Sequence, residues 1–253
     1  MSVTIAVAGK GGTGKTTFCG MLIDWLCRTG RGPVLAVDAD ANSNLNEVLG
    51  VEVEATLADV RETVAHAEEG SIPPGMSKQD YMNYKFGSAL IEEDDFDMLV
   101  MGHTQGKGCY CFVNGLLQTE IRKLESGYQY MVVDNEAGME HISRGILPSI
   151  DYLVLVSDCS RRGIQAVARI AELAGEIGVR PRKVALIVNR APGGVLNEGT
   201  REEIEKQGLE LIGVIPQDET IFEYDSFGKP TAYLPDGDGA KKAVNEIAER
   251  LLK

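Results

Sequence analysis

A glycine-rich loop near the start of the chain has the residue types of a phosphate-binding site. The segment "GKGGTGKTT" (9–17) matches the spacing G-x-x-x-x-G-K-[ST]. Glycines let the backbone curl until its N–H groups point at phosphate oxygens, and the N-terminus of a following helix attracts the same anion. Lys15 can reach β- and γ-phosphates, and the Thr16 hydroxyl can hold Mg²⁺. The phosphate-binding residues are therefore expected to be Gly9, Gly11, Gly12, Thr13, Gly14, Lys15, Thr16 and Thr17.

Aspartates follow two of the apolar runs that have the composition of buried strands. Asp38 and Asp40 lie in "DADANSNL" (38–45), and Asp134 begins "DNEAGMEH" (134–141). Carboxylates at strand ends beside a phosphate loop suit binding of Mg²⁺ and control of an attacking water. An aspartate at a strand end also serves as a turn residue or helix cap, and for each one alone that alternative stays open.

Two cysteines, Cys109 and Cys111, lie one residue apart in "GKGCYCFVNG" (106–115), where a helix is expected to begin. A helix N-terminus favours the thiolate, which is the form that binds metal. Ni²⁺ or Zn²⁺ bound by thiolates prefers four ligands, but one chain supplies two; His103, six residues away, is interpreted as a loop residue. A two-fold dimer would bring two pairs together and complete a Cys₄ site.

Two other interpretations of the cysteine pair stay open. A redox disulfide between cysteines this close would form a strained ring. The pair can also be structural, because free cysteines often act as small apolar residues. We assign that apolar role to Cys19, Cys27 and Cys159, and we favour a metal site for Cys109 and Cys111.

Apolar runs alternate with helical patterns along most of the chain, as in a doubly wound α/β fold with a mostly parallel sheet and helices on both faces. Strands are predicted at 3–8, 33–38, 96–102, 128–134, 152–157, 183–189 and 209–215. Helices are predicted at 15–29, 112–126, 162–177, 199–207 and 238–252. The acidic stretch 51–92 fits this alternation poorly and is predicted to be an insertion, with a helix near 56–66 and a small hairpin or loop near 72–90. We expect residues 1–253 to form one domain.

The bulk composition narrows the classes of partner. The chain has 25 basic and 38 acidic residues, for a formal net charge of −13. This charge disfavours non-specific binding to nucleic acids or anionic membranes, so we expect neither as a partner. An odd number of cysteines, five, without a secretory segment is typical of a cytoplasmic protein with reduced thiols.

The second lysine of the phosphate loop, Lys10, provides a resemblance to a known family. The form "KGGTGKT" (10–16) resembles the deviant P-loop of the MinD, ParA and nitrogenase-iron-protein group of ATPases. In that group the extra lysine reaches the nucleotide of a partner subunit. The resemblance implies a homodimer that closes face to face on ATP, with Lys10 and Lys15 both acting in catalysis.

The same resemblance implies roles for the aspartates. Asp40 would orient or activate the attacking water, and Asp38 would act near the metal through a water ligand. Asp134 would belong to the Mg²⁺ shell, and the N–H of Gly138 would sense the γ-phosphate. The D-x-x-x-G spacing of 134–138 matches the second switch of the group.

Base recognition is expected later in the chain. Asn189 ends an apolar run in "LIVNRAP" (186–192), where its amide can pair with the edge of adenine. The guanine-specific N-K-x-D pattern is absent there, which favours ATP over GTP. By resemblance, Ile215, Pro216 and Asp218 would pack against the base.

The cysteine pair distinguishes between subgroups of these ATPases. The segment 134–141 has no cysteine, unlike nitrogenase iron protein, and no cysteine follows Cys159, unlike the Mrp-type iron–sulfur scaffolds. The remaining resemblance is to the CooC-type accessory ATPases, which deliver nickel to carbon monoxide dehydrogenase. It implies an ATP-, Mg²⁺- and Ni²⁺- or Zn²⁺-binding homodimer with that enzyme as client. A ParA/MinD-like positioning ATPase and an iron–sulfur carrier or reductase are the alternatives.

Overall fold

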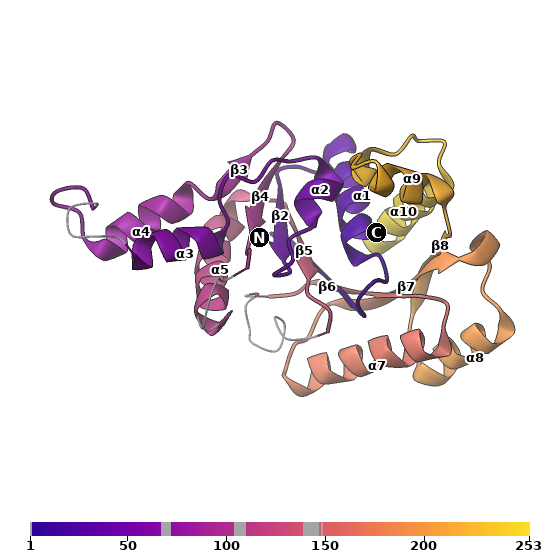
Figure 1. Cartoon of the computed structure of the whole chain (residues 1–253). Helices are drawn as coiled ribbons and strands as arrows, with labels where there is room; N and C mark the ends of the chain where they lie inside the picture. Colours follow the sequence, from indigo (N-terminus) through magenta and orange to yellow (C-terminus); the bar gives the residue numbers. More distant parts are fainter. Residues whose placement is uncertain (1, 67–71, 104–109, 139–146, 148) are drawn as a thin grey trace.

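The computed structural model describes residues 2–66, 72–103, 110–138, 147 and 149–253, with only the backbone of residues 78, 79 and 110–112. Within this part of the chain, eight strands form one sheet in the order β3-β4-β2-β5-β1-β6-β7-β8 (Figure 1). The strands are β1 (Val3–Gly9), β2 (Val34–Ala39), β3 (Leu90–Glu92), β4 (Phe96–Val100), β5 (Tyr130–Asn135), β6 (Tyr152–Ser157), β7 (Lys183–Ala191) and β8 (Leu211–Pro216). All neighbouring pairs are parallel except β3 with β4.

Helices connect the parallel strands. The described α-helices are α1 (Lys15–Arg28), α2 (Leu45–Leu49), α3 (Leu57–Ala65), α4 (Lys78–Gly87), α5 (Tyr110–Leu124), α7 (Arg161–Glu176), α8 (Glu198–Gln207), α9 (Glu219–Ser226) and α10 (Gly239–Leu251). Short 3₁₀ turns form η1 (Glu125–Gly127), η2 (Pro192–Gly194) and η3 (Thr231–Tyr233). Figure 1 shows α1 and α10 on one side of the sheet and α7 and α8 on the other.

The alternation of side chains along each central strand accounts for the two helical layers. In β1, Ile5 and Val7 pack into a core with α1 and α10, whereas Ala6 and Ala8 pack under α7. In β2, Leu35 and Val37 face a third cluster with α3 and α5. The central strands are apolar on both faces because both faces are covered by helices. The doubly wound α/β fold is thus confirmed.

All seven predicted strands are present, and the five predicted helices match α1, α5, α7, α8 and α10 within about two residues. The predicted helix near 56–66 is α3, but the hairpin or loop predicted near 72–90 is wrong, since this stretch contains α4. Ser77 caps α4 by accepting from Asp80 N–H, and Phe86 anchors the helix in the core at 2% exposure. The short elements α2, β3 and α9 were not predicted.

The carboxyl-terminal helix α10 packs into the fold by its apolar side. Its buried residues include Val244, Ile247 and Leu251, and Gly213 of β8 leaves room for the Ile247 side chain. An added Cβ at Gly213 would lie 2.2 Å from Ile247 Cγ1. Among the described residues, none of the helices has the length and apolar composition needed to cross a bilayer.

The capping box of α3 gives a first prediction about stability. Thr56 Oγ1 accepts from Asp59 N–H at 3.2 Å, and an Asp59 carboxylate oxygen accepts from Thr56 N–H at 2.9 Å. Replacing Thr56 with Ala removes the side-chain acceptor, so the free energy of unfolding should fall by about 1 kcal/mol. Urea unfolding measures this change. Thr56→Ser keeps the hydroxyl and should retain most of the stability; an equal loss in both variants would contradict the capping explanation.

Candidate nucleotide site

The phosphate loop joins β1 to α1 and depends on glycine at several positions. Gly12 and Gly14 have φ angles of 76° and 87°, in the left-handed region that favours glycine. A Cβ on Gly9 would lie 2.2 Å from Val156 O, and one on Gly14 would lie 2.3 Å from Asn189 Nδ2. Gly14 is the N-cap of α1 and provides no side-chain cap. The N–H groups of the first turn can therefore serve an anion.

The two signature lysines have different environments. Lys15 is 7% exposed, and its Nζ lies 3.5 Å from the carbonyl oxygen of Lys10. Thr13 Oγ1 donates to the same carbonyl at 2.9 Å, which closes the loop. The Lys10 side chain is exposed. Lys15 is thus held at the loop, while Lys10 extends into solvent.

Asp38 and Asp134 lie directly opposite each other on β2 and β5. They are 0% and 2% exposed, and Asp134 Oδ1 has no hydrogen-bond partner. Burial, with each carboxylate near other acidic groups, raises the pKa of Asp38 to about 7 and that of Asp134 to about 6. Thr16 and Lys15 act in the opposite direction on the pKa of Asp134. The Thr16 hydroxyl and two carboxylates, one of which has an unpaired oxygen, form a donor set that fits Mg²⁺.

Asp38 also organises the segment that follows β2. Its two carboxylate oxygens each accept one backbone hydrogen bond at 3.0 Å, from Asp40 N–H and from Leu45 N–H at the start of α2. Asp40 Oδ1 in turn accepts from the backbone N–H and side-chain amide of Asn42. The Asp38 carboxylate therefore fixes the loop that carries Asp40.

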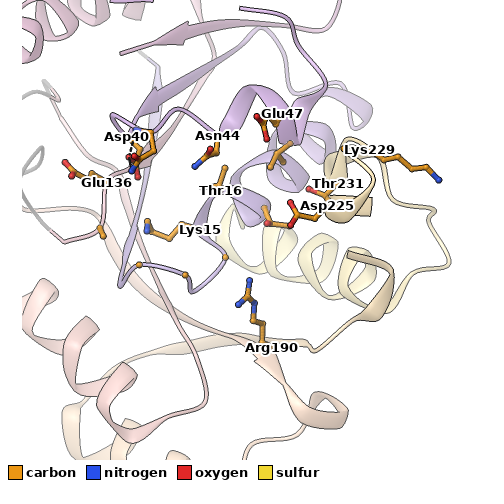
Figure 2. Close-up of a pocket in the computed structure, with 18 residues that line it drawn as sticks. Lys15, Thr16, Asp40, Asn44, Glu47, Glu136, Arg190, Asp225, Lys229 and Thr231 are labelled. Atoms are coloured by element: carbon orange, nitrogen blue, oxygen red, sulfur yellow. Dashed lines mark hydrogen bonds between the residues drawn. The ribbon is translucent and has the colours of Figure 1, made fainter. Parts of the chain in front are cut away.

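A cavity of about 470 Å³ lies over the phosphate loop, within the usual size range of ligand sites (Figure 2). It is lined by Gly11, Gly12, Gly14, Lys15, Thr16, Thr17, Asp40, Asn42, Asn44, Glu47, Val48, Glu136, Ala137, Arg190, Asp225, Gly228, Lys229 and Thr231. Four other predicted nucleotide or metal residues are not in this lining and belong to β1, the phosphate loop, β2 and β5, namely Gly9, Thr13, Asp38 and Asp134. Gly138 N–H donates to the carbonyl of Gly9 at 3.3 Å.

The residues predicted for base contact lie outside the cavity lining. Ile215 is 1% exposed in the core, and Asp218 caps α9 by accepting from Thr220 N–H; Pro216 ends β8. Asn189 Nδ2 donates to Thr13 O at 2.9 Å, and its Oδ1 accepts from Arg190 N–H at 2.8 Å. Asn189 therefore braces the phosphate loop, and the base contacts stay predictions.

One wall of the cavity was not predicted from the sequence. Asn44, Glu47 and Val48 come from α2 and the residue before it, and a second group comes from the end of α9 through η3. Arg190, also unpredicted, has a left-handed φ of 55°. The turn sequence "FGKP" (227–230) predicts a loop, but the local sequence does not indicate that this loop lies beside the phosphate loop.

The cysteine pair lies at the limit of the described residues. Cys109 is outside them, and Cys111 belongs to the first turn of α5, with its side chain outside them as well. Among the residues that the structure describes, no three or more His, Cys, Asp or Glu side chains form a group that could hold a metal ion.

Comparison with known proteins identifies the family of this site. The family described as CobQ/CobB/MinD/ParA nucleotide binding domain matches residues 4–231. The chain belongs to this family. An uncharacterized ATP-binding protein of Methanocaldococcus jannaschii is 41% identical over 98% of both chains. The carbon monoxide dehydrogenase accessory protein CooC of Rhodospirillum rubrum is 30% identical, over 88% of this chain and 87% of its own.

A solved structure with the same fold is MinD of Pyrococcus horikoshii in complex with Mg-ADP. It has a TM-score of 0.75 and 23% identity, and the match covers 100% of this chain and 97% of that one. Membership of the CobQ/CobB/MinD/ParA family confirms the prediction of an ATP-binding ATPase, and the use of Mg²⁺ stays a prediction.

The buried pair Asp38 and Asp134 gives a prediction about pH. Because their pKa values are raised in the folded protein, the two carboxyls favour folding when they are protonated. Their contribution to the free energy of unfolding is complete below about pH 4 and is lost as pH rises through about 6 to 7. Asp134→Asn cannot ionise and relieves Asp38 of a neighbouring charge. In metal-free protein, the stability of this variant relative to wild type should rise by roughly 1–2 kcal/mol between pH 5 and pH 8.

Urea unfolding in EDTA at several pH values tests this expectation. Asp97→Asn is a control on the neighbouring strand β4, because Asp97 is not in the buried pair. The raised pKa values would be contradicted if the stability of Asp134→Asn relative to wild type stayed constant or fell as pH rises.

Proposed function

We propose that this ATPase is a metal-delivery factor that binds Ni²⁺ through Cys109 and Cys111 and hands it to a carbon monoxide dehydrogenase. The observation that carries the proposal is the Cys-x-Cys sequence 109–111, of which Cys111 lies in the first turn of α5, in a chain that is 30% identical to CooC. Thiolates suit Ni²⁺ and Zn²⁺, and Ni²⁺ is here the cargo.

The fold supports a link between the cysteine pair and the nucleotide. The pair follows β4, which lies beside β2 in the sheet, with Val100 opposite Asp38. Met101 N–H donates to the carbonyl of Asp38 at 2.9 Å, so the chain leaves β4 next to the carboxylate pair. Cys109 is eight residues beyond this hydrogen bond. A change at the Asp38 loop therefore has a short covalent route to the thiols.

The proposed ATPase chemistry uses the groups around the cavity. Lys15 and the backbone N–H groups of the loop bind the β- and γ-phosphates, and Thr16, Asp38 and Asp134 hold Mg²⁺ and its water ligands. Bound Mg²⁺ supplies charge neutralisation for the phosphates. Asp40 orients the attacking water, and Gly138 N–H senses the γ-phosphate.

A homodimer completes both sites in this proposal. Two thiolates from one chain leave a four-ligand metal unsatisfied, whereas two-fold symmetry supplies four. The exposed Lys10 side chain is available to reach a nucleotide in the partner subunit. ATP can drive release of Ni²⁺ only if the ATP-bound and ADP-bound dimers bind it with different free energies.

Replacing both thiols tests the metal site. Wild-type protein loaded with Ni²⁺ or Zn²⁺ should retain one ion per two chains after desalting, and Cys109→Ser with Cys111→Ser should retain none, because a hydroxyl is a poor ligand for these ions. Elemental analysis measures the ion, and a fluorescent ATP analogue should bind both proteins equally. Cys27→Ser, whose thiol contacts Asp95 O at 3.4 Å, is the matched control and should retain the ion. Retention of stoichiometric metal by the double variant would contradict the proposal.

Two single substitutions separate nucleotide binding from hydrolysis. Lys15→Ala should weaken ATP binding by at least about tenfold, because it removes the buried cation of the loop. Asp40→Ala should still bind ATP but slow its hydrolysis by about 100-fold, since the water loses its orienting carboxylate. Asn42→Ala removes only a side-chain donor to Asp40, so its rate of ATP hydrolysis should lie between those of Asp40→Ala and wild type. Full turnover in Asp40→Ala would exclude the role given to this residue.

A further inference from the structure

Lys241 is a fully buried lysine that none of the proposed ATPase chemistry uses. It lies in the first turn of α10 and is 1% exposed. Its Nζ donates to the Asp24 carboxylate on α1 and to the carbonyl oxygen of Ala232 in η3. Asp24, 6% exposed at its side chain, also accepts from Arg28 Nε at 2.8 Å. A buried ion pair contributes little net stability compared with apolar residues of the same volume, so stability alone gives a weak reason for it.

The lysine fixes a segment that forms part of the nucleotide cavity. Ala232 follows Thr231, which lines the cavity and is 3% exposed. The η3 segment is confined on two further sides. An added Cβ at Gly20 of α1 would lie 2.2 Å from Val48 and 3.4 Å from Ala232, and one at Gly50, after α2, would lie 2.5 Å from Pro230. Lys241 supplies a further contact, from the side of α10.

The position of η3 in the cavity indicates which part of the nucleotide it faces. Figure 2 shows Lys15 and Asp40 on one side of the cavity and Asp225, Thr231 and Lys229 on the other. The side with Lys15 holds the phosphate loop, so the triphosphate belongs there. The ribose and base must extend from the triphosphate, and the cavity continues towards η3.

We propose that Lys241 is a positioning residue for nucleotide binding: by holding the Ala232 carbonyl against α1, it sets the η3 wall that receives the ribose and base. Lys241 does not touch the nucleotide in this proposal. The proposal concerns the ATP site alone and is independent of the metal carried by the protein.

Lys241→Met keeps the length of the side chain and removes both hydrogen bonds. We expect the Kd and KM for ATP to rise about five- to tenfold, while kcat at saturating ATP stays within about twofold of wild type. Inorganic tripolyphosphate, which has no ribose or base, should compete with ATP at the phosphate loop with an unchanged inhibition constant. Lys242→Met is the matched control, because Lys242 is the next residue of α10 and is exposed.

A double variant separates positioning from stability. Lys241→Met with Asp24→Asn leaves no unpaired buried charge and keeps an acceptor for Arg28, so its thermal stability should recover towards wild type while its KM for ATP stays high. Wild-type KM in a folded single or double variant would overturn the proposal. An equal loss of affinity for ATP and tripolyphosphate would also overturn it, because the phosphate loop itself would then have moved.

Discussion

The site depends on two carboxylates that the sheet forces together in its interior. Asp38 and Asp134 end neighbouring parallel strands in direct register, both almost fully buried. Burial is the main cause that raises the pKa of both carboxyls; the charge of Asp134 adds to the effect on Asp38, and that of Asp40 adds to the effect on Asp134. The protein is thus built around a place for positive charge, which Lys15 at the start of α1 partly supplies and a bound Mg²⁺ would complete.

Both strands of this pair lead into the segments that are predicted to respond to the nucleotide. Asp38 holds the Asp40 loop and the start of α2 by two hydrogen bonds, and α2 packs against η3 on the far wall of the cavity. Asp134 leads to Gly138, whose N–H reaches back to Gly9. The carboxylate pair, the Asp40 loop and the η3 wall of the cavity are therefore connected through a few short elements. In the proposed mechanism, a nucleotide-driven switch would act through this connection.

The sequence was informative where one local pattern decides the structure. Strands apolar on both faces, and a glycine loop between a strand and a helix, predicted the sheet and the phosphate loop. The segment 72–90 was predicted wrongly because its turn-forming "IPPG" outweighed the weaker helical pattern that Ser77 caps. The far wall was missed because it results from long-range packing, such as the contact of Gly20 with Val48 and Ala232, which leaves no mark in local sequence. Asn189 shows the same limit, since its bond to Thr13 O spans 176 residues.

The proposed function requires that the nucleotide bound beside Asp38 and Asp134 change the affinity of Cys109 and Cys111 for metal. The direct measurement is the Kd for Ni²⁺ of the dimeric Asp40→Ala variant, which is expected to hydrolyse ATP slowly. This Kd is determined once with Mg-ATP and once with Mg-ADP. We predict that the two Kd values differ by at least about fivefold, and that Ni²⁺ shifts the Kd for ATP by the same factor. Equal Ni²⁺ affinities in both nucleotide states would contradict the proposed coupling between nucleotide and metal binding.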